Sequence, residues 1–236
     1  MNVLAVSFKF LSLLGGFATV GVLLAMAFLL LDQEGKLSTS GEKLRTIFKV
    51  SAAVWVVGAI GNIVFTLAQI LATPVSGALD LTVLRSFITQ ITLGRYLAFQ
   101  ALIALIVLGI SFTAKKILTL IFTMIIALVA LVAPVFQSHS ASGGSHSLVI
   151  GSLVIHVFAL ALWVGGILAI GLLSETDRAI AVPRFSQLAL WSAIAVVISG
   201  GVNAWARLNF TAAWGSKYAY IVIAKVVATI ALVSIG

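Results

Sequence analysis

The sequence lacks cysteine and has few ionisable residues. Its 236 residues include three histidines, six acidic residues and only 8% charged residues in total. Without cysteine, disulfides and thiolate chemistry are excluded. No carboxylate falls inside the long apolar segments, so a carboxylate proton relay across a membrane is excluded too. Because we also find no set of nucleophile, base and orienting group and no phosphate-binding glycine loop, we do not expect an enzyme.

The rest of the composition is typical of a membrane protein. Hydrophobic residues make up 62% of the chain and the mean hydropathy is +1.24, which is more apolar surface than a soluble domain can bury. A helix needs roughly 20 apolar residues to cross the hydrocarbon core. Seven such runs are present, at residues 4–31, 47–72, 95–113, 116–136, 147–173, 186–207 and 218–236. Their continuity favours helices over barrel strands, so we predict an all-α, polytopic transmembrane helical bundle of about seven spans.

Residues 74–94, between the second and third runs, are too polar to cross a membrane. Leu81, Leu84, Phe87, Ile88 and Ile91 recur there at three- and four-residue steps, the spacing of one helix face. We therefore predict an amphipathic helix that lies in the membrane interface.

Lysine and arginine are unevenly divided between the loops, and an excess of them marks the cytoplasmic side. The loops after the first, third and fifth runs hold eight, namely Lys36, Lys43, Arg45, Lys49, Lys115, Lys116, Arg178 and Arg184. The opposite side holds five, namely Lys9, Arg85, Arg95, Arg207 and Lys217. We therefore expect the amino terminus to lie outside. The net charge of +8 is scattered over many loops, which fits anchoring at a membrane surface and not binding to nucleic acid.

All three histidines lie in or beside the fifth run. His139 and His146 belong to a loop rich in glycine and serine, and His156 lies about ten residues inside the apolar segment. An ionisable side chain in hydrocarbon is costly, so its default interpretation is functional. The structural alternative is a neutral imidazole bonded to a backbone carbonyl or to Ser152, one turn earlier. Since imidazole suits copper and zinc, we take His139, His146 and His156 as candidate metal ligands.

Polar side chains also mark two other runs. The second run carries a stripe with heptad spacing, made by Trp55, Asn62 and Gln69 with Thr66 between them. The sixth carries Ser192, Ser199 and Asn203 beside Gly200 and Gly201. Such stripes serve either as hydrogen bonds and close packing between helices or as the lining of an ion pathway. The candidate lining residues are Asn62, Gln69, Trp163, Ser199 and Asn203, with Trp163 on the helix face of His156.

Four segments of the chain carry a resemblance to a known family, namely residues 156–166 (HVFALALWVGG), 184–190 (RFSQLAL), 199–205 (SGGVNAW) and 217–225 (KYAYIVIAK). Together they resemble the CopD copper-resistance family of bacterial inner-membrane proteins. The resemblance is clearest over residues 137–236. The layout is also similar to actinobacterial proteins in which a CopD-like half is fused to a half like the CtaG cytochrome oxidase assembly factor.

The resemblance implies copper transport or copper resistance in the plasma (inner) membrane of a bacterium, with copper moving from the outer face toward the cytoplasm or to copper enzymes. On this interpretation His139 and His146 capture the ion, and His156 receives it about 13 Å deeper, at 1.5 Å rise per residue. We expect two domains, an amino-terminal four-helix half (residues 1–136) and a CopD-like domain (residues 137–236). Family members continue beyond the segment around Lys225 with further spans, so we expect this second domain to be incomplete at Gly236.

Two other functions stay open. A haem-binding membrane electron carrier would use histidine as an axial ligand, but it needs histidines paired at similar depth, and His156 alone lies deep in a run. A copper-assembly scaffold would pass the ion to a partner, such as a CtaG-like domain or cytochrome oxidase, without transport. Both the scaffold and the transporter would use the same three histidines.

Overall fold

The chain folds as a bundle of long helices. The computed structural model describes residues 2–30, 35–137, 146–208, 215, 219–224 and 226–227. Six helices among these residues are long and apolar enough to cross a membrane, which confirms the predicted all-α transmembrane bundle. The seventh predicted span, residues 218–236, lies mostly outside the described residues.

The spans differ in regularity. The first joins helix α1 (Asn2–Leu24) to a π-helical turn, η1 (Ala25–Leu29). The fourth joins α6 (Ile117–Val132) to a 3-10 turn, η2 (Ala133–Gln137). The remaining four are α2 (Thr39–Leu71), α5 (Thr92–Thr113), α7 (His146–Gly171) and α8 (Glu175–Leu208). Two short helices, α3 (Val75–Ala78) and α4 (Leu81–Gln90), connect α2 to α5.

Helices α2 and α8 begin well before their apolar runs. The hydroxyl of Ser38 accepts the backbone N–H of Gly41 and so caps the start of α2. Glu175 and Asp177 occupy the first turn of α8, where negative charge stabilises a helix. At 33 and 34 residues, each helix is about 50 Å long, against a hydrocarbon core of about 30 Å. The apolar runs therefore mark the part of each helix inside the membrane, and the helices project beyond it.

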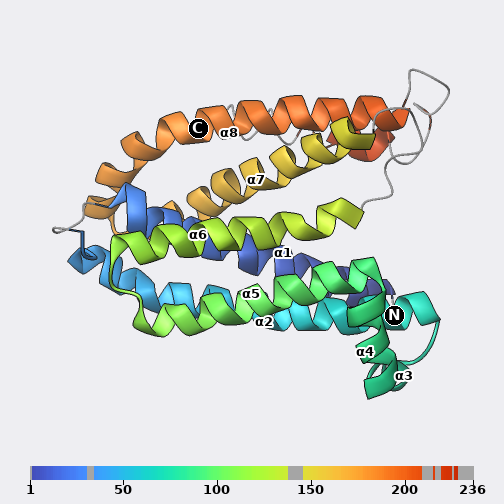
Figure 1. Ribbon diagram of the computed structural model, residues 1–236. Helices are drawn as coiled ribbons and strands as arrows, with labels where there is room; N and C mark the ends of the chain where they lie inside the picture. Colours follow the sequence, from blue (N-terminus) through green and yellow to red (C-terminus); the bar gives the residue numbers. More distant parts are fainter. Residues whose placement is uncertain are drawn as a thin grey trace.

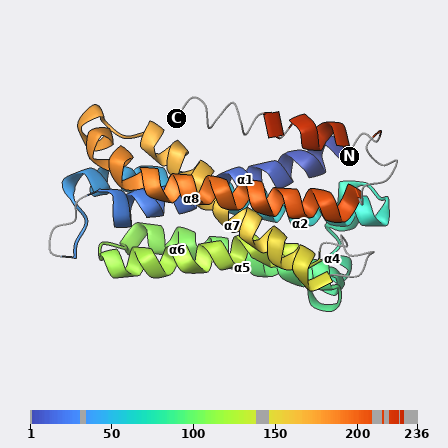
Figure 2. The ribbon, with the colours of Figure 1, turned by 90° about the horizontal axis from the view of Figure 1, so that it is seen from above.

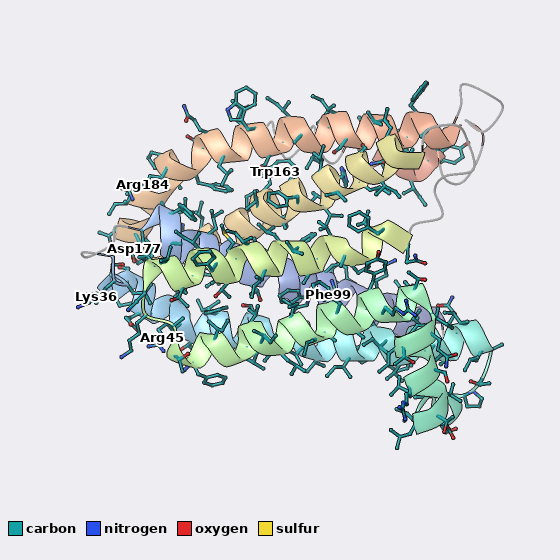
Figure 3. All side chains as sticks on the ribbon, viewed as in Figure 1. Lys36, Arg45, Phe99, Trp163, Asp177 and Arg184 are labelled. Atoms are coloured by element: carbon teal, nitrogen blue, oxygen red, sulfur yellow. The ribbon has the colours of Figure 1, made fainter. Side chains whose placement is uncertain are left out.

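The six long helices form three layers of two. Figure 1 shows α7 with α8, then α1 with α6, then α2 with α5. The α1–α2, α5–α6 and α7–α8 connections lie at one end, here called the basic end, and α7 begins at the opposite end, here called the histidine end. Figure 3 shows Lys36, Arg45, Asp177 and Arg184 together at the basic end. The three loops predicted to share one side of the membrane thus lie at one end of the bundle.

Polar contacts join the three connections at the basic end. The backbone N–H of Leu37 donates to the carbonyl of Lys115 (3.2 Å), and that of Ile117 donates to the carbonyl of Gly35 (3.1 Å). The hydroxyl of Ser40 donates to a carboxylate oxygen of Asp177 (2.6 Å). The first contacts tie the α1–α2 loop to the α5–α6 loop, and the last ties α2 to α8.

Helix α4 projects sideways from the histidine end of the bundle (Figure 1). Asp80 caps it by accepting the N–H groups of Thr82 and Val83. Phe87 is buried against α5, where Gly94 leaves room for it. A helix is therefore present where the amphipathic helix was predicted, and of the residues on its predicted apolar face Phe87 is buried and Leu81 is 82% exposed.

Helices α1 and α7 cross at a pair of glycines. A Cβ added at Gly21 would overlap the backbone of Gly165, and one added at Gly165 would overlap the carbonyl oxygen of Phe17. A Cβ at Gly166, the next residue, would overlap the ring of Phe185 on α8. Side chains as small as glycine let helix backbones meet in a membrane. This crossing joins α7 and α8 to the rest of the bundle.

Candidate functional site

The candidate site lies where α7 packs against α8. His156 is the eleventh residue of the 26 in α7, which places its half-buried imidazole near the middle of the span. Its Nδ1 lies 3.0 Å from the hydroxyl oxygen of Ser199 on α8. Gly200 packs beside the ring, because a Cβ there would lie 3.5 Å from Cε1 and 3.8 Å from Nδ1. The Nδ1 edge of the imidazole therefore faces the backbone of α8.

The Ser199 hydroxyl also contacts its own helix. Its oxygen lies 2.5 Å from the carbonyl oxygen of Ala195 and 3.2 Å from that of Val196, in addition to its contact with Nδ1 of His156. Which atom donates in the His156–Ser199 hydrogen bond depends on the tautomer of the imidazole.

Two further side chains bind the backbone carbonyl of Ser199. The hydroxyl of Ser152 donates to it at 2.9 Å, and the Nδ2 amide of Asn203 donates at 2.8 Å. The amide oxygen of Asn203 is buried and has no hydrogen-bond partner within the part of the chain that the structure describes. Within the described residues, the cluster thus contains one buried acceptor without a partner, the Asn203 amide oxygen.

The cluster forms a polar series that leads in from the histidine end. Helix α7 starts there at His146, and α8 ends there at Leu208. Ser152 and Asn203 precede His156 and Ser199 on the way to the middle of the bundle. His139 lies outside the described residues, and His146 is placed only as the first residue of α7. One of the two proposed capture histidines, His146, therefore begins α7 at the end of the bundle from which this series starts.

Beyond His156 larger side chains pack between α7 and α8. Trp163 is buried on α7 (Figure 3) and Ser192 is buried on α8. Further on, the ring of Phe185 fills the space left by Gly166. The hydrogen-bonded cluster around His156 thus lies at about half the depth of the bundle, and Ser192 is a further buried polar side chain beyond it.

The second polar stripe lies elsewhere. Asn62 is buried on α2 and accepts a hydrogen bond from Thr66 of the same helix (3.2 Å), while Gln69 is exposed near the end of α2. Helix α1 packs against both α2 and α7 and stands between Asn62 and His156. The structure therefore does not bring Asn62 or Gln69 together with His156, Ser199 and Asn203.

Two features of the site were not predicted from the sequence. The imidazole binds Ser199, which lies 43 residues further along the chain on α8. Ser152, one turn before His156, binds the backbone carbonyl of Ser199 instead. The second feature is the π-helical turn η1, in which Met26 is fully buried. The pattern of apolar residues did not predict this turn. Such turns often occur at functional sites, and η1 contacts α8.

The described residues contain no group of three or more His, Cys, Asp or Glu side chains that could hold a metal ion. This part of the chain therefore contains no structural metal site of the type in which several such side chains enclose the ion. One imidazole with nearby oxygen acceptors is instead suited to weak, exchangeable contact with a cation. Such contact is what an ion needs in order to enter a site and leave it again.

Comparison with known proteins assigns the family. Residues 1–148 match the family described as copper resistance protein D-like, N-terminal domain, and residues 179–236 match the family described as copper resistance protein D. No curated protein and no solved structure matches the chain. The first match covers more than half of the 236 residues, and the second includes Ser199 and Asn203. The chain therefore belongs to the copper resistance protein D family of multi-pass membrane proteins.

Proposed function

We propose that the protein carries copper from the outer face of a bacterial inner membrane toward the cytoplasm, along the interface between α7 and α8. In this mechanism His139 and His146 capture the ion at the histidine end, and His156 receives it near mid-membrane. Ser152 and Asn203 lie on the way and offer oxygen atoms to the passing ion. Trp163 and the apolar contacts beyond it separate the site from the basic end.

The observation that carries this proposal is the polar cluster around His156 near mid-membrane. The cluster joins the imidazole, the Ser152 and Ser199 hydroxyls and the Asn203 amide, and the amide oxygen of Asn203 is buried with no hydrogen-bond partner among the described residues. Acceptor atoms attract a cation and repel an anion. An imidazole nitrogen is moreover a preferred ligand of copper.

The positions of the positive charges support an outside amino terminus. Lys36, Arg45, Lys115 and Lys116 lie at the basic end of the bundle, which by the positive-inside rule is cytoplasmic. The histidine end then faces outward, where copper arrives. We propose further that the α1–α6 half and the CopD-like half act as two domains joined at the Gly21–Gly165 crossing.

Delivery to a partner is the second candidate. The polar series ends halfway through the bundle at His156, so an ion held there could pass to another protein, such as a CtaG-like assembly domain or cytochrome oxidase, without crossing. The haem alternative has less support. Among the side chains that the structure describes, His156 is the one histidine, and a bis-histidine haem needs two at matching depth.

Copper binding by the purified protein tests the proposal. In a background of His139→Ala with His146→Ala, the protein in lipid nanodiscs should bind one Cu(I) or Cu(II) ion, and adding His156→Ala should abolish binding. Ser192→Ala is the matched control, because Ser192 is a buried serine on the same helix, about two turns from Ser199. Equal copper binding with and without His156 would refute the proposal.

A further inference from the structure

Two lysines lie opposite each other at the basic end of the bundle. The backbone of Lys36, in the α1–α2 connection, forms an isolated antiparallel bridge with that of Lys116, the residue before α6. The backbone hydrogen bonds on either side make them a non-hydrogen-bonded pair, the type in which opposite side chains come closest. Leu37 is buried, so its neighbour Lys36 points outward, and Lys116 points outward with it.

This lysine pair has no negative partner among the described residues. Like charges directly opposite each other in two paired strands are destabilising. Other positive side chains at the basic end are compensated, since Arg45 forms an ion pair with Glu42 (3.0 Å) and Lys49 lies over the ring of Phe112 (5.0 Å). The contact of Arg45 with Glu42 is the one ion pair within the described part of the chain. The lysine pair is therefore not neutralised there.

The two connections as a whole carry an excess of positive charge. Residues 32–49 and 115–116 contain six positive and three negative side chains, a net charge of +3. Of the three acidic residues, Asp32 and Glu34 lie outside the described residues, and Glu42 already has an ion-pair partner. The first turn of α6 has no acidic residue either. An external anion is thus needed to balance the charge.

The lysine pair lies at the level of the lipid headgroups. Helix α5 ends at Thr113 and α6 begins at Ile117, and both belong to spans. The three residues between them keep Lys116 at the membrane surface. Further along α6, Leu118 and Phe122 are 62% and 60% exposed, one turn apart on a face that acyl chains cover. A phospholipid that lies against this face brings its phosphate to Lys116.

We propose that Lys36 and Lys116 together bind the phosphate of an anionic phospholipid, which joins the α1–α2 connection to the α5–α6 connection. Ammonium groups bind phosphate oxygens through charge-assisted hydrogen bonds, and basic sites between membrane helices hold anionic headgroups. In a zwitterionic phospholipid the headgroup's own positive charge offsets the phosphate, so this site selects lipids of net negative charge. The lipid site is separate from the copper pathway and does not depend on it.

Native mass spectrometry of the full chain in detergent tests the proposal with phosphatidylglycerol and phosphatidylcholine. The parent should prefer phosphatidylglycerol. Lys36→Gln with Lys116→Gln should weaken its binding about 30-fold, from about fivefold for each lysine, and leave phosphatidylcholine binding unchanged. Lys36→Arg with Lys116→Arg keeps both charges and should bind like the parent. Lys43→Gln with Arg184→Gln is the matched control, because it removes the same charge from exposed positions at the basic end.

Thermal unfolding of the same proteins gives a second measurement. In lipid-free detergent the protein with Lys36→Gln and Lys116→Gln should be at least as stable as the parent, because the repulsion is gone. Phosphatidylglycerol should reverse this order, since a ligand stabilises the folded protein that binds it. Equal phosphatidylglycerol binding by these two proteins, or a lower Tm of the glutamine variant without lipid, would overturn the inference. Inorganic phosphate that stabilises the parent as well as the lipid does would also overturn it, because the site would then bind a free anion.

Discussion

Replacing Gly21 by alanine should destabilise the bundle measurably. The added methyl group would overlap the carbonyl oxygen, carbon and Cα of Gly165, which are backbone atoms and cannot rotate away. Overpacking of this kind costs about 1–3 kcal/mol, and the rigid contact favours the upper value. Alanine regains about 1 kcal/mol over glycine in helix propensity, so the net loss should be about 2 kcal/mol.

Gly109→Ala is the matched control for this substitution. Gly109 lies in α5 and an added Cβ there would meet nothing within 4 Å, so the change should gain about 1 kcal/mol. The two variants then differ by about 3 kcal/mol, or about 6–12 °C in Tm for a chain of this size. Tryptophan fluorescence reports the unfolding, since the chain has five tryptophans and no cysteine for a thiol dye. A Gly21→Ala protein at least as stable as Gly109→Ala would refute the close crossing of α1 and α7.

Three further predictions follow from the ends of the bundle and from the histidine count. A cysteine at Ser142 should react with a membrane-impermeant thiol reagent in intact cells and one at Lys115 should not; the reverse labelling would contradict an outside amino terminus. Asp177→Ala removes both a first-turn negative charge and the acceptor of the Ser40 hydroxyl, and the lost hydrogen bond, worth about 1 kcal/mol, should lower Tm by about 2–4 °C more than Glu175→Ala does, which removes a first-turn charge alone; equal shifts would argue against the contact between α2 and α8. The purified protein should show no Soret absorption, and a Soret band that copurifies with it would favour haem.

The bundle itself could be predicted because the hydrocarbon core dictates apolar runs of a set length. Those runs located six described spans, but they missed the starts of α2 and α8, since the first turns of both helices are polar and lie beyond the membrane. The capping hydroxyl of Ser38 was the available signal for α2. For α8 the acidic residues Glu175 and Asp177 indicated a helix start, but Pro183, which lies inside the helix, argued against a helix through that position.

The partner of His156 could not be predicted from spacing. A symmetric hairpin centred on Ser174 would place Ser192 opposite His156, whereas the structure places Ser199 there, about two turns further along α8. Helix α8 bends soon after it begins (Figure 1), and Figure 2 shows α7 crossing beneath it at an angle and not running alongside. The register between two helices depends on such bends and crossings, which are set by contacts such as Gly166 with Phe185 and not by the local sequence.

The neighbours of the polar stripes could not be predicted from the sequence either. Heptad spacing predicted that Asn62 and Gln69 share a face of α2, but it could not say which neighbour that face would meet. Gly58 packs against Ser12 of α1, so the stripe on α2 turns toward α1. The face of α8 that carries Ser199 and Asn203 turns toward α7 instead.

Copper flux into sealed vesicles tests the central claim most directly. Proteoliposomes that contain the parent, His156→Ala or Gly200→Ala are given external copper, and a chelating dye in the lumen reports its arrival. If copper passes through His156, the parent and Gly200→Ala should fill the vesicles, and His156→Ala should fall to the level of protein-free vesicles. Filling by His156→Ala at the rate of the parent would contradict the pathway between α7 and α8.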